Sequence, residues 1–335
     1  MTDLSTSWLG LTLRSPLVVA ASPISRDLAA AKQAVAAGAG AIVMYSLFEE
    51  QVVAEQMAAH HFLDSRIDND AEARSFLPES DVFALGTEPY LRQLEQLSQH
   101  LDVPVIGSLN GHTPGGWTDY ARQMEARGAA AIELNLYEVV SSARQSGAEI
   151  ESNQLRIVDN VVRQVNVPVA VKLCPFYSAL PSFATQLKNA GASGVTLFNR
   201  FYQPDIDLEQ LDVDLKLAYS TPAELPLRLH ALAILHPCSG LDLACSGGVH
   251  SGLDAAKAIL AGASVVQLAS ALLEHGPAHL ANIQAELQQW LQQKQYRSVG
   301  EACGVMSMAS APDPQQWERL NYMKILQGWR PRGRG

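Results

Sequence analysis

Two short apolar runs near residue 250 each end in small residues that could hold a phosphate. The run at 241–245 is followed by Ser-Gly-Gly, and the run at 264–268 is followed by Ala-Ser. A helical pattern separates them, so both runs are predicted to be buried strands. Strand ends of this kind leave backbone N–H groups free to bind an anion. We therefore predict a phosphate site on the backbone of Gly247, Gly248, Ala269 and Ser270.

A lysine and two asparagines stand at the ends of three other apolar runs. Lys172 closes the run VPVAVK, where a charged amine is costly unless it meets a negative or electron-rich partner. That partner is either a ligand or a neighbouring carboxylate such as Glu133. Asn135 and Asn199 carry side chains that both donate and accept hydrogen bonds, so each either binds a ligand or caps the following loop.

A phosphate site beside a lysine at the same end of parallel strands suits FMN. With the phosphate on the small-residue strand ends, Lys172 would face the heteroatom edge of a planar ring. Its charge would stabilise the negative charge of reduced flavin. Ser108, at the end of another apolar run, is a further candidate flavin contact.

Predicted strands and helices that would position these residues alternate along almost the whole chain. Apolar runs typical of buried parallel strands alternate with Ala-rich helical patterns that end in Gly. The predicted strands are 17–21, 41–44, 104–108, 131–135, 168–173, 194–198, 241–245 and 264–268. Eight βα units favour a (β/α)8 TIM barrel. An open doubly wound sheet is the alternative, although no G-x-G-x-x-G follows the first strand.

Three long segments interrupt this alternation, each after the carboxyl end of a strand. They are residues 46–86, 136–151 and 199–226, and we expect insertions at the C-terminal mouth of the barrel, where barrel enzymes build their sites. We expect one barrel domain over residues 1–297, followed by a C-terminal extension over 298–335.

Composition excludes several other classes of protein. The net charge of −10 disfavours nucleic acid or an anionic membrane as the main partner, and no apolar run is long enough to span a bilayer. The start of the chain lacks the pattern of a signal peptide. The four cysteines form no CxxC pair, which favours reduced thiols in a cytoplasmic protein. No metal site is predicted: His60-His61 diverge on any regular element, and Glu49-Glu50 are expected in a solvated loop.

Several of these stretches resemble the dihydroorotate dehydrogenases, FMN-dependent (β/α)8 barrels of pyrimidine biosynthesis. They are SPLVVAAS, VKLCPF, LFNR and SGGVHSGLDAAKAILAGASVVQLASALLEHGP, and the resemblance runs from about residue 16 to about residue 276. The resemblance implies that Gly247, Gly248 and Ser270 hold the FMN phosphate. It further implies flavin contacts from Ala20, Ala21, Asn135 and Lys172, and a pyrimidine contact from Asn199.

The resemblance is weaker on the substrate side. Tyr45 stands where the family has a lysine that contacts flavin and substrate. Glu138 stands at the position of the catalytic Cys or Ser, and Val140 replaces an asparagine of the same loop. The Asn-Ser-x-Gly substrate loop is not recognisable, and AYSTPAE replaces a Gly-Gly segment after the sixth strand. Glu138 and Tyr45 are therefore the candidate catalytic residues, in a divergent branch of the family.

These observations predict an FMN oxidoreductase acting on dihydroorotate or a related small, planar or carboxylated substrate. One alternative is a reductase-type subunit that exchanges electrons with NAD(P)H or a ferredoxin-type partner. Another is a flavin- or phosphate-binding scaffold without catalysis. The resemblance also implies a homodimer.

Overall fold

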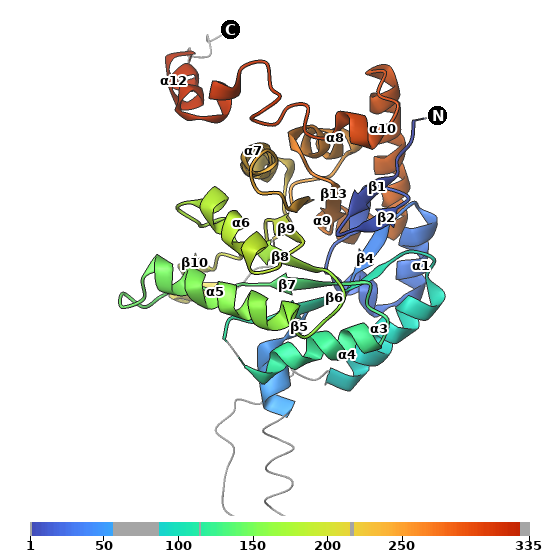
Figure 1. Cartoon of the computed structure of the whole chain (residues 1–335), viewed down its shortest axis with the longest axis vertical. Coiled ribbons are helices and arrows are strands. Elements are labelled where there is room, and N and C mark those ends of the chain that lie inside the picture. Colours follow the sequence, from blue (N-terminus) through green and yellow to red (C-terminus); the bar gives the residue numbers. More distant parts are fainter. Residues whose placement is uncertain (1, 56–86, 114, 215–217, 329–335) are drawn as a thin grey trace, which may run out of the picture.

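The eight predicted strands form a closed parallel barrel in the computed structural model, which describes residues 2–55, 87–113, 115–214 and 218–328 (Figure 1). Closure comes from β4, which pairs with both β3 and β6, so the open-sheet alternative is wrong. The barrel strands are β3 (Leu17–Val19), β4 (Ala41–Val43), β6 (Val105–Asn110), β7 (Ala131–Asn135), β8 (Val169–Leu173), β9 (Gly194–Leu197), β12 (Asp242–Ser246) and β13 (Val265–Leu268).

A helical segment follows every barrel strand and covers its outer face. Several helices end at a glycine in a positive-φ conformation, among them Gly262, with a φ of 120°, after the helix between β12 and β13. The main covering helices are α1 (Leu28–Ala36), α3 (Thr87–His100), α4 (Tyr120–Ala126), α5 (Gly147–Val162), α6 (Leu180–Asn189), α7 (Leu225–Leu235), α8 (Gly252–Ala261) and α10 (Leu280–Gln293). The short α9 (Ser270–His275) lies between β13 and α10.

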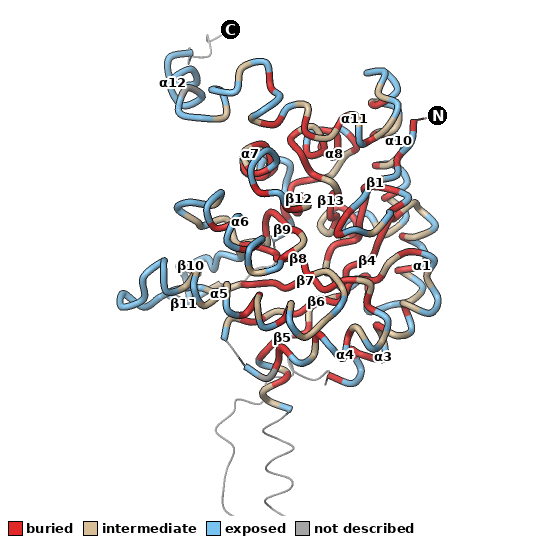
Figure 2. The backbone as a smooth tube through the Cα atoms, viewed as in Figure 1, coloured by how far each residue is buried: buried red, intermediate tan, exposed pale blue. Residues whose placement is uncertain are grey.

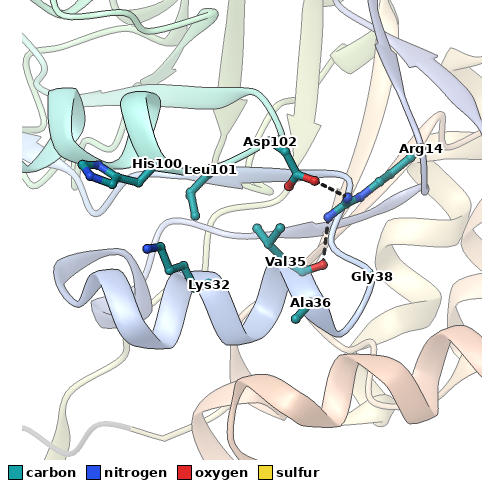
Figure 3. Close-up of a pocket in the computed structure, with 8 residues that line it drawn as sticks. All are labelled: Arg14, Lys32, Val35, Ala36, Gly38, His100, Leu101 and Asp102. Carbon is teal, nitrogen blue, oxygen red and sulfur yellow. Dashed lines mark hydrogen bonds and ion pairs between the residues drawn. The ribbon is translucent and has the colours of Figure 1, made fainter.

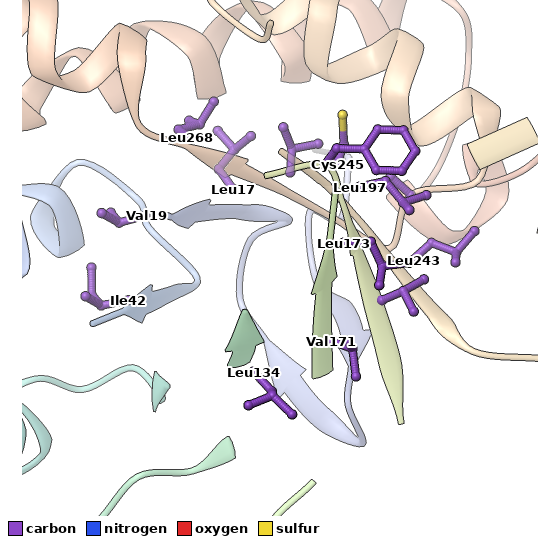
Figure 4. Close-up of a cluster of buried hydrophobic side chains, with 14 of the residues drawn as sticks. Leu17, Val19, Ile42, Leu134, Val171, Leu173, Leu197, Leu243, Cys245 and Leu268 are labelled. Atoms are coloured by element: carbon purple, nitrogen blue, oxygen red, sulfur yellow. The ribbon is translucent and has the colours of Figure 1, made fainter. Parts of the chain in front are cut away.

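The barrel strands are buried on both faces, which explains why they appear in the sequence as continuous apolar runs (Figure 2). Alternate residues point outward to the helices, as Leu17, Val19, Leu134 and Val171 do in the large outer cluster (Figure 4). The other residues of the same strands form a second cluster inside the barrel, which includes Val18.

A short N-terminal hairpin, which the sequence pattern did not predict, closes the N-terminal end of the barrel strands. Its strands, β1 (Thr6–Trp8) and β2 (Leu11–Leu13), pair antiparallel, and Trp8 and Leu13 are fully buried against the inner cluster. This apolar plug leaves the opposite, C-terminal end as the open mouth.

Insertions follow the carboxyl ends of β4, β7 and β9, as predicted. After β4 comes β5 (Leu47–Phe48), which pairs with β6, and residues 49–55 are helical; residues 56–86, including His60-His61, lie outside the described residues. After β9 come β10 (Asp205–Asp207) and β11 (Asp212–Asp214), an antiparallel pair.

One expectation for the first insertion is wrong. Glu49 is buried instead of solvated, and its carboxylate accepts hydrogen bonds from the amides of His112 (2.8 Å) and Thr113 (3.1 Å). The buried carboxylate thereby ties the segment after β4 to the loop after β6.

The chain beyond α10 continues across the outer helices. Within α11 (Val299–Ala302) both terminal residues are buried, and the amide of Met308 donates to the carbonyl of Ala233 on α7. The last described helix, α12 (Arg319–Gly328), lies farthest from the barrel in Figure 1. The division at residue 297 stays a prediction. Within the described ranges, no helix combines the length and apolarity that crossing a membrane requires.

Candidate functional site

A cavity of about 300 Å³ opens at the C-terminal mouth of the barrel. Its walls come from the ends of β3, β4, β6, β7, β8 and β9, so it draws together residues that are distant in sequence. It is lined by Ala21, Ser22, Pro23, Arg26, Tyr45, Ser46, Phe48, Asn110, Asn135, Tyr137, Lys172, Asn199 and Tyr202. Four of the predicted site residues besides Ala21 therefore share one cavity: Tyr45, Asn135, Lys172 and Asn199.

Lys172 stands on a buried polar network at the floor of this cavity. Its Nζ is 3.4 Å from Glu133 Oε1 and 3.4 Å from Gln267 Oε1. Glu133 is fully buried, and its other oxygen accepts hydrogen bonds from Thr196 Oγ1 (3.0 Å) and Gln267 Nε2 (2.5 Å). Of the two partners considered for Lys172, the neighbouring carboxylate Glu133 is present. Lys172 also lines the cavity, so the ion pair holds its amine at the cavity wall.

Loss of this ion pair has a measurable consequence for stability. We expect Glu133→Gln, which preserves side-chain volume, to lower the free energy of unfolding by about 3 kcal/mol, since it leaves a buried amine without a counter-charge. Urea unfolding of the purified protein measures this. The double variant Glu133→Gln/Lys172→Met is the control and should recover part of the loss. A single variant as stable as the parent would contradict the argument.

Two of the predicted ligand contacts, both asparagines, lie side by side in the cavity lining. Asn199 Nδ2 donates to Asn135 Oδ1 at 3.1 Å, so the two predicted ligand contacts orient one another. The predicted contact Ser108 lies deeper than expected, because β6 continues to Asn110, which lines the cavity in its place. Ser108 is fully buried, and its hydroxyl pairs with Ser46 Oγ at 2.9 Å.

The small-residue ends of β12 and β13 lie side by side next to this cavity and meet around Ser220. The amide of Gly248 donates to Ser220 Oγ (3.1 Å), and the amide of Ser220 donates to Ser270 Oγ (3.0 Å). The hydroxyl of Ser220 thus occupies the acceptor position between the two predicted phosphate-binding ends. Ala20 is buried beside them, where its amide donates to the carbonyl of Leu268.

Backbone geometry explains the glycines. Gly247 and Gly248 have φ values of 91° and 78°, which side chains rarely adopt. A Cβ atom on Gly248 would lie 2.7 Å from the amide nitrogen of Leu225, and one on Gly247 would lie 2.8 Å from Arg228 Nη2. Arg228 is buried behind these glycines, and its Nε donates to the carbonyl of Ser246 at 2.8 Å. Burial lowers the pKa of Arg228, while Cys245 and Glu224 raise it.

The two candidate catalytic residues lie in different cavities. Tyr45 lines the mouth cavity, and Arg26 lies over its ring with 4.7 Å between guanidinium carbon and ring centroid. Burial raises the pKa of Tyr45, and the charge of Arg26 lowers it. Glu138 lines a neighbouring cavity of about 350 Å³ together with Phe176 and Phe201. Glu138 Oε2 is buried and accepts no hydrogen bond from the described residues.

A third, larger cavity lies at the other end of the barrel and has a structural explanation. It lies between the end of α1 and the segment after α3, ahead of the barrel strands, with a volume of about 560 Å³ (Figure 3). The guanidinium of Arg14 there donates hydrogen bonds to Asp102 Oδ2 (3.1 Å) and to the carbonyls of Val35 (2.8 Å) and Ala39 (3.2 Å). The mouth is therefore the better candidate for chemistry.

Comparison with known proteins identifies the family of this chain. The family model for dihydroorotate dehydrogenase matches residues 3–291. A protein of Aeropyrum pernix whose name assigns it to dihydroorotate dehydrogenase A (fumarate) is 29% identical over 221 residues, 64% of this chain and 71% of that one. The dihydroorotate dehydrogenase B (NAD(+)) catalytic subunit of Thermoplasma acidophilum is 27% identical over 313 residues, 91% of this chain and 99% of that one.

A protein with the same name from Endomicrobium trichonymphae is 28% identical over 312 residues, 90% of this chain and 96% of that one. The family-model match extends from the N-terminal hairpin into α10. The chain belongs to the dihydroorotate dehydrogenase family of flavin-dependent oxidoreductases.

Proposed function

We propose that this chain binds FMN non-covalently at the barrel mouth and oxidises dihydroorotate or a closely related carboxylated ring. The observation that supports this most directly is the mouth cavity, where Lys172, Asn135 and Asn199 meet beside the ends of β12 and β13. When bound, FMN would accept a hydride from the substrate.

The residues present fit FMN. Lys172 presents an amine held by Glu133, and Ser22 Oγ is buried without a hydrogen-bond partner among the described residues. The Gly248 amide already donates to an oxygen, Ser220 Oγ, at the proposed phosphate position. A phosphate there would share or replace that hydroxyl, with Arg228 supplying positive charge from behind. Ala20 and Ala21 would lie along the flavin, and Asn199 would bind the substrate ring. Ser108 would contribute indirectly, through its hydrogen bond to the hydroxyl of Ser46.

For proton removal we propose Glu138, with Tyr45 as the second candidate. Removal of a hydride from one carbon of a C–C bond must be matched by removal of a proton from the neighbouring carbon. Glu138 is a carboxylate on the loop that follows β7, and one of its oxygens is available as an acceptor. Because it lines the neighbouring cavity, this assignment requires its side chain to turn toward Asn135.

Anaerobic mixing with candidate donors tests the proposed reaction. We expect dihydroorotate to bleach the bound flavin, because the cavity offers polar groups for a small ring and positive charge for a carboxylate. Dihydrouracil, which has the same ring without the carboxylate, is the matched control. The measurement is the loss of flavin absorbance after mixing.

Other donors decide between the remaining functions. Reduction by NADH, NADPH or reduced ferredoxin alone would overturn the proposal in favour of a reductase-type subunit. A flavin that no donor reduces would indicate a scaffold. A protein that neither contains nor takes up FMN would contradict the proposed flavin-dependent function.

We also propose that the chain forms a homodimer, passes electrons to a partner protein and works in the cytoplasm. The β10–β11 pair has exposed Ile206 and Val213 opposite one another, an apolar face that a second copy would cover. The names of the relatives from Thermoplasma and Endomicrobium include the words catalytic subunit, which supports a partner. The four free cysteines support a reducing compartment. Sedimentation of the full chain measures the oligomeric state.

A further inference from the structure

The mouth cavity contains a positive charge that the protein itself does not balance. Its lining includes two cations, Lys172 and Arg26, and no carboxylate of the described residues. Lys172 is neutralised from below by Glu133. Arg26 makes no ion pair with any carboxylate in the part of the chain that the structure describes, so its guanidinium is available to a ligand.

Arg26 is also held in a defined position. It ends a short 3-10 helix, Pro23–Arg26, directly after β3, and its guanidinium lies over the ring of Tyr45. Ser25, the preceding residue, is fully buried. Its hydroxyl accepts a hydrogen bond from the amide of Tyr45 (2.7 Å) and donates one to the carbonyl of Ser22 (3.0 Å). The backbone that carries the arginine is thereby tied to the strand end that carries the tyrosine.

The ring beneath Arg26 is fixed in turn. Tyr45 packs edge-on against Tyr90, with 4.9 Å between ring centroids. The hydroxyl of Tyr90 is anchored to the backbone of Ser108, donating to its carbonyl (3.1 Å) and accepting from its amide (2.9 Å). Since burial raises the pKa of Tyr45, its phenol stays neutral at physiological pH and adds no negative charge that would cancel the arginine.

We propose that Arg26 is a specificity-determining residue that binds the carboxylate of a planar substrate, with Tyr45 as the platform that orients its guanidinium. The planar fork of an arginine matches a carboxylate with two parallel hydrogen bonds, which a lysine cannot offer. The positive charge expected from a lysine at the position of Tyr45 is supplied instead by the neighbouring loop. This inference rests on the proposed oxidation of a carboxylated ring at the same cavity.

Ligand pairs that differ only in the carboxylate test the role of Arg26. The probes are orotate and uracil, nicotinate and nicotinamide, and benzoate and benzamide, titrated into flavin-loaded protein and followed by the flavin absorbance. Ligand-induced shifts in melting temperature are measured in parallel, because they need no flavin signal. We compare the parent protein with Arg26→Gln and Arg26→Lys. The control is Arg92→Gln, which removes an exposed arginine paired with Glu88 on α3.

We expect the parent to bind at least one carboxylate about tenfold more tightly than its neutral partner, and Arg26→Gln to abolish that preference. Affinity for the neutral partner should change less than about twofold, Arg26→Lys should retain part of the preference, and Arg92→Gln should retain all of it. A preference that survives in Arg26→Gln, or a parent without preference in any pair, overturns the inference. An Arg26-dependent preference for nicotinate or benzoate but not orotate would sustain it and exclude dihydroorotate as the substrate.

Discussion

Gly248→Glu should purify colourless, with affinity for added FMN reduced at least about 100-fold. A carboxylate at this position would face the proposed phosphate, and juxtaposed like charges cost several kcal/mol, which is two or more factors of ten in affinity. The backbone adds to the effect, because a side chain at a φ of 78° with its Cβ 2.7 Å from the Leu225 nitrogen displaces the start of α7. Flavin content after purification and titration with FMN measure the loss.

Two further variants separate repulsion of the phosphate from a damaged fold. Gly276→Glu introduces the same residue at a φ of 84°, but nothing lies within 4 Å of its Cβ, so this variant should stay yellow. Ser270→Asp places a carboxylate at the first residue of α9 without backbone strain, and negative charge is favourable at the start of a helix. It should fold normally and lose FMN. If Ser270→Asp and Gly248→Glu both bind FMN like the parent, the phosphate is held elsewhere.

Most of the barrel could be predicted from the sequence because its strands are buried on both faces. Such strands appear as uninterrupted apolar runs, and all eight were located within a residue or two of their observed ends. The two-residue difference at the end of β6 still matters, because the strand continues through Leu109 to Asn110, so that Asn110 and not Ser108 reaches the cavity. The N-terminal hairpin was missed because strands of three residues show no usable periodicity.

Site residues on the strands or within a few residues of their ends could be predicted, whereas those farther along the loops could not. Lys172 and its partner Glu133 stood out as charges within apolar runs. Gln267 is likewise a polar residue within an apolar run, VVQL, but it was not singled out as a site residue. Arg26 and Ser220 lie in segments whose placement depends on tertiary contacts, such as the bond from the Ser220 amide to Ser270 Oγ. Polar residues in loops are too common for composition alone to single them out.

Glu138→Gln should slow the reduction of flavin by substrate roughly 10²- to 10⁴-fold, the range expected when a general base is removed. Glutamine keeps the size and hydrogen-bonding shape of the side chain but cannot accept a proton. Stopped-flow mixing under anaerobic conditions isolates this step from later turnover. FMN content should be unchanged, because Glu138 lies apart from Lys172 and Gly248 in the neighbouring cavity.

Glu151→Gln is the matched control for this prediction, because Glu151 is a second carboxylate on the wall of the same cavity. It should leave the rate within about threefold, since a group that moves no proton contributes no general-base catalysis. If Glu138→Gln also leaves the rate unchanged, Glu138 is not the base. A loss in Tyr45→Phe would then assign proton transfer to the phenol that lines the mouth cavity. Its pKa, raised by burial, would in that case require the rate of flavin reduction to increase with pH through the alkaline range.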